Sequence, residues 1–168
     1  TQNNLAIIPV INKIDLPSAD PDSVKEQLED VLQIESDQAV LTSAKEGIGI
    51  EDVMKAVVKF IPAPTGNSEK PLQALLFDAW YDSYRGVIVL IRVVEGCLKI
   101  GMRIRFMSSG TEFDVEEIGT FTPTQKQSKS LQAGEVGYVI AAIKGMDQTK
   151  IGDTITESNR PTEKPLLG

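Results

Sequence analysis

Histidine is absent from the 168 residues, and cysteine occurs once, at Cys97. Serine and cysteine nucleophiles that depend on a histidine base therefore cannot be assembled from this chain. One thiol makes no internal disulfide and, without histidine, no zinc site. The acidic residues lack the Asp-x-Asp-x-Asp-Gly spacing of a calcium loop, so we expect no metal ligands and read most of these acids as solvated surface.

The chain also lacks a long apolar run. Its longest, Leu5 to Ile11, is interrupted by Pro9 and is too short to cross a bilayer. No secretory leader pattern opens the sequence, and the single cysteine favours a reducing compartment. The net charge of −7 argues against a protein that holds nucleic acid through a general basic field. We therefore expect no DNA binding, and RNA contacts that are local.

The first 61 residues contain two alternations of strand and helix patterns. The β-branched run Leu5 to Ile11 predicts a parallel strand buried on both faces, and an amphipathic helix follows over Pro21 to Gln33. A second short strand over Ala39 to Leu41 and a second helix over Ile50 to Ile61 come next. This order predicts an α/β fold with a parallel sheet, in which ligands bind at the carboxyl ends of the strands.

Prolines, glycine and small polar residues over 62–71 predict a linker that ends this domain at residue 61. Helical periodicity then disappears, and the spacing of strands and turns over 72–156 predicts an all-β antiparallel barrel. A second linker is expected over 157–168 because it contains two prolines and a glycine. The expected barrel strands are Leu72–Trp80, Gly86–Val94, Met102–Met107, Glu112–Ile118 and Val136–Ile143.

Polar residues directly follow both predicted strands of the α/β half. Asn12 to Asp15 read Asn-Lys-Ile-Asp after the first strand, and Ser43 to Lys45 read Ser-Ala-Lys after the second. Either match alone is weak, because Asn and Asp are ordinary turn residues. Together, at the ends of neighbouring strands, they resemble the guanine-specificity motifs Asn-Lys-x-Asp and Ser-Ala-Lys of the P-loop GTPase superfamily.

The chemistry of guanine explains the residue types of the first motif. Guanine presents an N1–H and a 2-amino group, and one carboxylate, here Asp15, can accept a hydrogen bond from both. Asn12 would tie the loop to its surroundings and meet the base at N7. The aliphatic stem of Lys13 would lie over the ring, with its ammonium in solvent.

The resemblance supplies the roles of the second motif. It implies that the backbone N–H of Ala44 reaches the guanine O6, while Ser43 and Lys45 shape and cover the pocket. The sequence holds no Gly-x-x-x-x-Gly-Lys-Ser/Thr phosphate loop and no switch segment that would supply a magnesium ligand. GTP or GDP is thus the implied ligand, with Mg²⁺ in an intact domain, and we expect this chain alone to be catalytically inert.

The second half carries a narrower resemblance. Phe77 to Gly86 and Arg92 to Gly96 are similar to the opening of the second domain in the LepA family of translational GTPases. Ala133 to Gly137 and Gly152 to Ile155 are similar to later turns and strands of that barrel. Pro165 to Gly168 resemble the connection to a third domain. The similarity extends over essentially the whole chain.

Membership of the LepA family implies a GTP hydrolase that acts on the ribosome and is linked to back-translocation and to translational fidelity under stress. The implied partners are guanine nucleotide, ribosomal RNA and small-subunit proteins, with a local contact at Arg85 and Gly86. The resemblance also implies a monomer in the cytoplasm. It leaves room for peripheral association with the cytoplasmic face of the bacterial inner membrane, and for an organellar homologue.

Two alternatives to the LepA interpretation stay open. One is another factor with the same two domains, of the elongation factor G, BipA or ribosomal-protection type; the other is a non-catalytic ribosome-binding barrel. The aromatic residues near Arg85 also have two interpretations. Trp80, Tyr81 and Tyr84 suit an RNA-stacking platform, but we favour a barrel filled by Trp80 and one tyrosine, with Arg85 bracing a turn.

Overall fold

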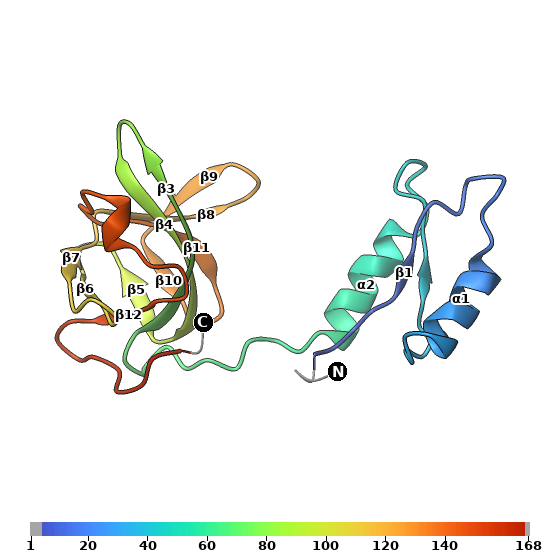
Figure 1. Ribbon diagram of the computed structural model, residues 1–168, viewed down its shortest axis with the longest axis horizontal. Helices are drawn as coiled ribbons and strands as arrows, with labels where there is room; N and C mark the ends of the chain where they lie inside the picture. Colours follow the sequence, from blue (N-terminus) through green and yellow to red (C-terminus); the bar gives the residue numbers. More distant parts are fainter. Residues whose placement is uncertain (1–4, 167–168) are drawn as a thin grey trace. The chain divides into compact units, whose positions relative to one another are not determined.

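The computed structural model describes residues 5–166 (Figure 1). The chain divides into two compact units, Thr1–Ala63 and Pro64–Gly168. Residues 1–4 of the expected nucleotide domain and residues 167–168 of the expected second linker lie outside the described residues. No helix within residues 5–166 is both long enough and apolar enough to span a membrane.

The first unit has the expected order of strand, helix, strand, helix. Two short parallel strands, β1 (Val10–Ile11) and β2 (Val40–Leu41), pair with each other. Figure 1 shows α1 (Pro21–Asp30) and α2 (Ile50–Phe60) on opposite sides of this strand pair. The expected strand Leu5–Ile11 is wrong in length and burial. Val10 is 44% exposed, because β2 is the one strand that pairs with β1 among the described residues.

Local chemistry sets the ends of both helices. The Asp20 carboxylate accepts a hydrogen bond from the Ser23 N–H at 3.1 Å and caps α1. We expected α1 to reach Gln33, but Gln33 has a φ of 54°, a left-handed conformation that stops the helix at Asp30. Helix α2 ends at Phe60, two residues before Pro62.

The second unit is an antiparallel β-barrel. Eight strands form one sheet in the order β7-β6-β12-β3-β4-β11-β8-β9, and β5 pairs separately with β10. Every pairing in this unit is antiparallel. The strands are β3 (Gln73–Asp82), β4 (Gly86–Glu95), β5 (Cys97–Lys99), β6 (Arg103–Phe106), β7 (Glu112–Asp114), β8 (Glu117–Phe121), β9 (Gln125–Ser128), β10 (Ser130–Gln132), β11 (Val136–Ile140) and β12 (Thr154–Glu157).

The alternation pattern did not predict four strands, β5, β9, β10 and β12, although the family resemblance included Gly152 to Ile155, where β12 begins. They have three or four residues each, and β9 reads Gln-Lys-Gln-Ser, which has no apolar alternation. The expected strand Glu112–Ile118 is two strands, because Val115 turns into the core and its N–H bonds to the Met102 carbonyl. The expected strand Val136–Ile143 ends at Ile140, just before Ala142, whose φ is 47°.

The barrel core comes from alternating residues of the strands. In β6, for example, Ile104 and Phe106 are fully buried while Arg103 and Arg105 are exposed. A smaller cluster on the same sheet contains Ile88, Tyr138 and Ile140, with Trp80 and Leu90 packed against it. The main core contains Leu72, Ala74, Leu76, Val87, Val89, Ile91, Val93, Leu98, Ile104, Phe106, Val115, Ile118, Leu131, Val139, Ala141, Ile143 and Ile155.

Candidate guanine-base site

The first motif forms a tight turn at the carboxyl end of β1. Lys13 has a φ of 68°, and the Leu16 N–H donates to the Lys13 carbonyl at 3.2 Å. The Ile14 N–H donates across to the Thr42 carbonyl at 3.2 Å, which joins the turn to the end of β2. The loop therefore has a defined backbone path, with Asp15 half-buried.

The second motif lies in the short loop that connects β2 to α2. Ser43 is fully buried and exchanges two backbone hydrogen bonds with Ile48, each 3.0 Å long. Gly49, which precedes α2, has a φ of 71°, and a Cβ there would overlap the Leu41 carbonyl oxygen. Glycine is needed at this position for both reasons.

Side-chain hydrogen bonds hold the two motifs together. The Ser43 hydroxyl donates to Asp15 Oδ1 at 2.6 Å, and Asn12 Oδ1 accepts from the Ala44 N–H at 3.1 Å. The second oxygen of Asp15 accepts no hydrogen bond from any residue between 5 and 166. Four of the predicted site residues are thus brought together, and one carboxylate oxygen keeps its lone pairs for a ligand.

The Ala44 amide has a different partner from the one that the GTPase resemblance implies. Its N–H already donates to Asn12 Oδ1, whereas the resemblance assigns that hydrogen to the guanine O6. One N–H can share two acceptors or exchange one for the other. A bound guanine would therefore have to compete with Asn12 for this amide.

The two lysines of the motifs lie at the surface. Lys13 is exposed, and the Lys45 ammonium lies 3.3 Å from the Glu46 carboxylate in an exposed ion pair. Pairs of this kind contribute little to stability. Neither lysine forms an ion pair with the Asp15 carboxylate among the described residues.

Sequence reasoning missed Thr42, which is 2% exposed and lies between the two motifs. Its hydroxyl lies 3.3 Å from the Ile11 carbonyl and 3.3 Å from Asn12 Oδ1. The Thr42 hydroxyl therefore helps to orient the side-chain amide of Asn12. The available signal was a hydroxyl residue directly before the Ser-Ala-Lys motif, at the end of a strand.

The other predicted contact, Arg85 and Gly86, lies at the tip of the β3–β4 hairpin. The Asp82 carboxylate accepts the N–H groups of Tyr84 and Arg85 at 2.9 Å, and both bonds lower the pKa of Asp82. The Arg85 guanidinium lies 3.6 Å from Asp82 and 3.8 Å from Glu117. Arg85 therefore braces the turn, and Gly86 provides its left-handed φ of 75°.

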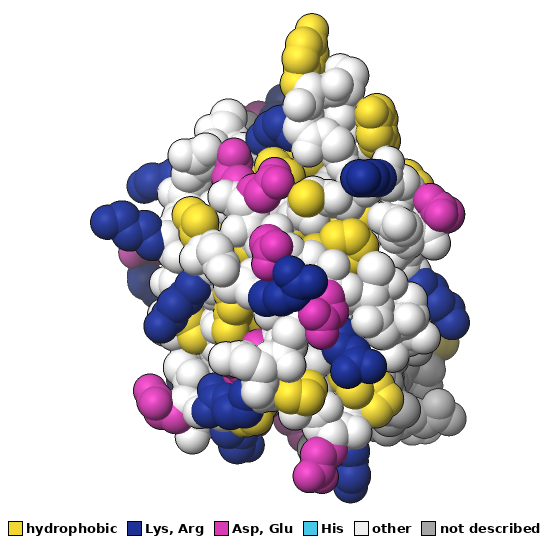
Figure 2. Space-filling model, turned by 90° about the vertical axis from the view of Figure 1, so that its left-hand side faces the viewer, with side chains coloured by type: hydrophobic (Ala, Val, Ile, Leu, Met, Phe, Trp, Pro, Cys, Tyr) yellow, Lys and Arg dark blue, Asp and Glu magenta, His cyan; other side chains and the backbone are white. Residues whose placement is uncertain are grey.

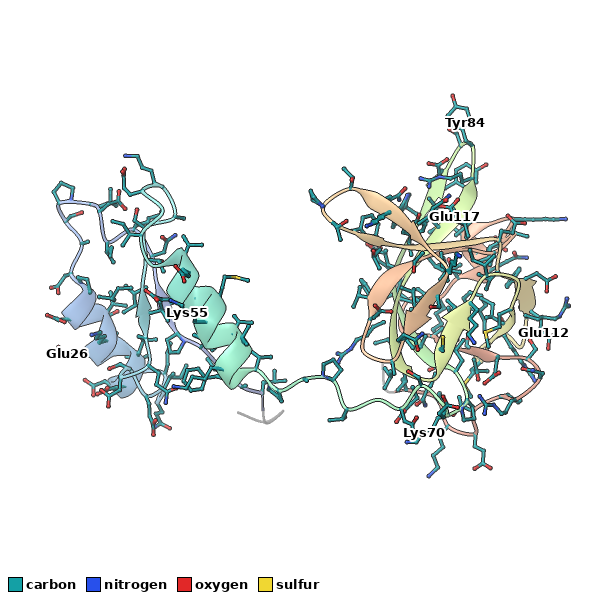
Figure 3. The ribbon with its side chains drawn as sticks, turned by 180° about the vertical axis from the view of Figure 1, so that it is seen from behind. Glu26, Lys55, Lys70, Tyr84, Glu112 and Glu117 are labelled. Atoms are coloured by element: carbon teal, nitrogen blue, oxygen red, sulfur yellow. The ribbon has the colours of Figure 1, made fainter. Side chains whose placement is uncertain are left out.

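The tyrosines near this tip do not fill the barrel. Figure 3 shows Tyr84 projecting from the end of the hairpin; it is 96% exposed, and Tyr81 is 62% exposed. Trp80 packs against the smaller cluster, where the buried tyrosine is Tyr138 instead. The expectation that one of these two tyrosines fills the barrel is wrong, because the side chains of both Tyr81 and Tyr84 are largely exposed to solvent.

Two family models match the chain. The model described as elongation factor Tu GTP binding domain matches residues 1–63, and elongation factor Tu domain 2 matches residues 86–156. Elongation factor 4 of Bacillus mycoides (strain KBAB4) is 54% identical over 166 residues, as is that of Bacillus cereus (strain AH187). Each alignment covers 99% of this chain. The chain thus matches elongation factor 4 (LepA) over nearly its whole length.

The chain spans about a quarter of the length of these curated relatives, 27% in both cases. The elongation factor 4 similarity includes both guanine-motif loops and the hairpin tip, since nearly the whole chain is aligned. It confirms the family resemblance that the second half of the sequence predicts.

Solved structures of translation factors share the fold. Translation elongation factor SelB from Methanococcus maripaludis, in its apo form, aligns with a TM-score of 0.73 and 19% identity, over 94% of this chain and 35% of that one. A bacterial selenocysteine-specific elongation factor, EF-Sec, aligns with a TM-score of 0.67 and 22% identity, over 89% and 26%. The predicted α/β part followed by a translation-factor second domain is confirmed.

Proposed function

We propose that Asp15, Asn12 and Ala44 read the guanine base of GTP or GDP in a translational GTPase of the elongation factor 4 type. The observation that supports this most is the Ser43–Asp15 hydrogen bond of 2.6 Å, which joins the two motifs at the carboxyl ends of β1 and β2. Asp15 can then pair with the N1–H and 2-amino group, and Lys13 can lie over the ring.

The complete protein, in this proposal, hydrolyses GTP. This chain supplies the base-reading loops, while its sequence has no phosphate loop and no switch segment. The β- and γ-phosphates and Mg²⁺ are therefore assigned to parts of the complete protein other than these residues. The isolated 168-residue chain is expected to give no GTP turnover above background.

A base-specificity switch tests the assignment. Asp15→Asn in the full-length protein places an amide against the two guanine donors, and loss of such a pair reduces selectivity by roughly 10⁴-fold. Xanthine carries a carbonyl in place of the 2-amino group, so the amide can donate to it. The variant should lose turnover with GTP and regain it with xanthosine triphosphate.

Two further variants make the result specific. Asp15→Ala should lose GTP turnover without gaining xanthosine triphosphate turnover. Asp52→Asn makes the same chemical change on the exposed surface of α2 and should alter neither. If Asp15 merely holds its turn, Asp15→Asn costs about 1 kcal/mol of stability. An unchanged preference for GTP in that variant would contradict the guanine assignment.

We also propose that the barrel contacts the ribosome through the turn at Arg85 and Gly86, with ribosomal RNA and small-subunit proteins as partners. Support comes from the family and from the charge distribution. Figure 2 shows basic and acidic side chains interspersed over one face of the barrel, without a continuous basic area. A local contact suits such a surface better than general electrostatic binding.

The ribosome contact has its own test. Arg85→Ala in the full-length protein should weaken ribosome binding in a pelleting assay, while Arg103→Ala, another exposed arginine paired with two carboxylates, should not. Equal binding by both variants and the unmodified protein would contradict this contact.

The cellular role follows from the same proposal. A monomeric factor of this family would act in the cytoplasm, in back-translocation and translational fidelity under stress. Peripheral attachment to the inner membrane is a finer proposal that rests on the family resemblance. Sedimentation with ribosome-free membrane vesicles checks it.

A further inference from the structure

Residues 67–72, here called the lead-in segment, are hydrogen-bonded to the barrel although they precede its first strand. The Asn67 N–H donates to Glu95 Oε2 at 2.6 Å, and the Lys70 ammonium donates to Glu95 Oε1 at 2.8 Å. The Lys70 bond and the Asn67 N–H lower the pKa of Glu95. The Gly96 N–H donates to the Asn67 carbonyl at 2.9 Å. Much of the expected linker 62–71 is thus part of the barrel.

Residues 158–166, here called the tail segment, are attached in the same way. The Thr162 N–H donates to Thr156 Oγ1 and the Leu166 N–H donates to Thr154 Oγ1, both at 2.8 Å. Thr154 and Thr156 are each 1% exposed. The tail segment therefore covers β12, instead of leaving the barrel directly as the expected linker 157–168 would.

One arginine joins the two segments. Arg160 donates to Glu157 Oε1 through Nε at 3.1 Å and through Nη2 at 3.0 Å. It also donates from Nη1 to the Glu69 carbonyl at 3.0 Å and from Nη2 to the Lys70 carbonyl at 3.2 Å. The Leu72 N–H completes the group by donating to Glu157 Oε1 at 3.0 Å. We call these five residues the clasp.

The chemistry of the clasp makes its parts interdependent. Glu157 is 5% exposed, and a buried carboxylate is strongly destabilised when its counter-charge is removed. The guanidinium is planar and carries five N–H donors in a fixed fork, so it can hold a carboxylate and two carbonyls together. If Arg160 moves away with the tail segment, Glu157 loses its charge partner and the lead-in segment loses two of its hydrogen bonds.

We propose that the clasp is a conformational latch that couples the segment entering the barrel to the segment leaving it, so that neither detaches without loosening the other. Arg160 and Glu69 are 91 residues apart in the sequence, and Arg160 bonds directly to the Glu69 carbonyl. Figure 3 places Lys70 at the end of the barrel opposite Tyr84. The latch therefore acts away from the hairpin tip, and it does not rest on the guanine or ribosome proposals.

Hydrogen exchange of the 168-residue chain, followed amide by amide by NMR, tests the latch. Arg160→Ala should speed exchange at Leu72 and Gly96 in or against the lead-in segment, and at Thr162 and Leu166, by roughly tenfold or more. Amides of the core strands β4 and β11 should keep their rates. Arg160→Lys preserves the charge but not the fork, so it should loosen both segments as well.

The reverse perturbation separates a latch from two independent attachments. Glu95→Gln weakens contacts that hold the lead-in segment without involving Arg160. If the two segments are coupled, hydrogen exchange must also become faster at the Thr162 and Leu166 amides. Arg85→Ala, a matched loss of an arginine that faces two carboxylates at the opposite end, should change neither segment. Faster exchange confined to the lead-in segment in Glu95→Gln, or uniformly faster exchange of the core in Arg160→Ala, would overturn the latch.

Discussion

The change Tyr138→Phe is predicted to lower the free energy of unfolding at neutral pH and to raise it at high pH. The ring of Tyr138 is 1% exposed and meets Phe121 edge-on, with ring centroids 5.6 Å apart. Its hydroxyl donates to Glu117 Oε1 at 2.8 Å. The change Tyr138→Phe keeps the ring and its packing and removes only the hydroxyl and this hydrogen bond.

At neutral pH the variant should be less stable. A hydrogen bond to a charged group contributes about 1.5–3 kcal/mol, but the Glu117 side chain is 23% exposed and also faces Arg85, so we expect about 1 kcal/mol here. The remaining carboxylate keeps contact with Arg85 and with water. The loss is therefore a partial one.

At high pH the Tyr138→Phe variant should become more stable than the unmodified protein. Burial, followed by the hydrogen bond and charge of Glu117, raises the pKa of Tyr138 from 10.0 to about 12. Because the pKa of Tyr138 is raised in the folded state, the protonated hydroxyl contributes to the free energy of unfolding. This contribution is fully present below pH 10 and is lost as the pH rises towards 12. The loss amounts to about 1.4 kcal/mol at pH 11 and about 2 kcal/mol at pH 12. Phenylalanine has no such loss, so the two stability curves should cross near pH 11.

Urea unfolding of both proteins between pH 7 and 12 measures the difference directly. Other groups that titrate in this range are common to both proteins and cancel in the difference. Tyr84→Phe is the matched control, because it removes an exposed hydroxyl and should shift stability by less than about 0.5 kcal/mol at every pH. A difference between the unmodified chain and Tyr138→Phe that stays constant from pH 7 to 12 would refute the reasoning.

Two further predictions concern the backbone. Ala142 has a φ of 47°, which disfavours a side chain, so Ala142→Gly should raise the free energy of unfolding by roughly 0.5–1 kcal/mol in urea titrations; a decrease would show that the strain is absent. Limited proteolysis should cut first within residues 61–65, because hydrogen bonds to the barrel begin at Asn67. Mass spectrometry identifies the site, and a first cut within 67–72 would contradict this.

The alternation of apolar residues predicted most of the fold. It placed β3, β4 and β6 and both helices, since each of these presents a regular apolar face. It missed β9 and β10, which are polar or very short and are held by their neighbours in the sheet. Propensity and pattern describe single segments, whereas such strands exist because the fold places another segment beside them for pairing: β8 beside β9, and β5 beside β10.

The candidate site was predictable to the extent that it follows topology. Adjacent parallel strands end at the same edge of a sheet, so Asn12, Asp15, Ser43 and Ala44 had to lie near one another. Which hydrogen bonds form could not be read from the sequence. The partner of the Ala44 amide depends on the orientation of the Asn12 side chain, and Thr42 helps to set that orientation.

Thr42 and Glu157 were missed for one physical reason. Both are polar and both are buried, and their side chains form hydrogen bonds inside the fold: the Thr42 hydroxyl donates towards Asn12 Oδ1, and the Glu157 carboxylate accepts from the Leu72 N–H. In a sequence, such residues look the same as the many solvated polar residues around them. The polar contacts that join distant segments are therefore what the structure adds to the sequence, and two examples are the contacts between the two candidate motifs and those of the clasp.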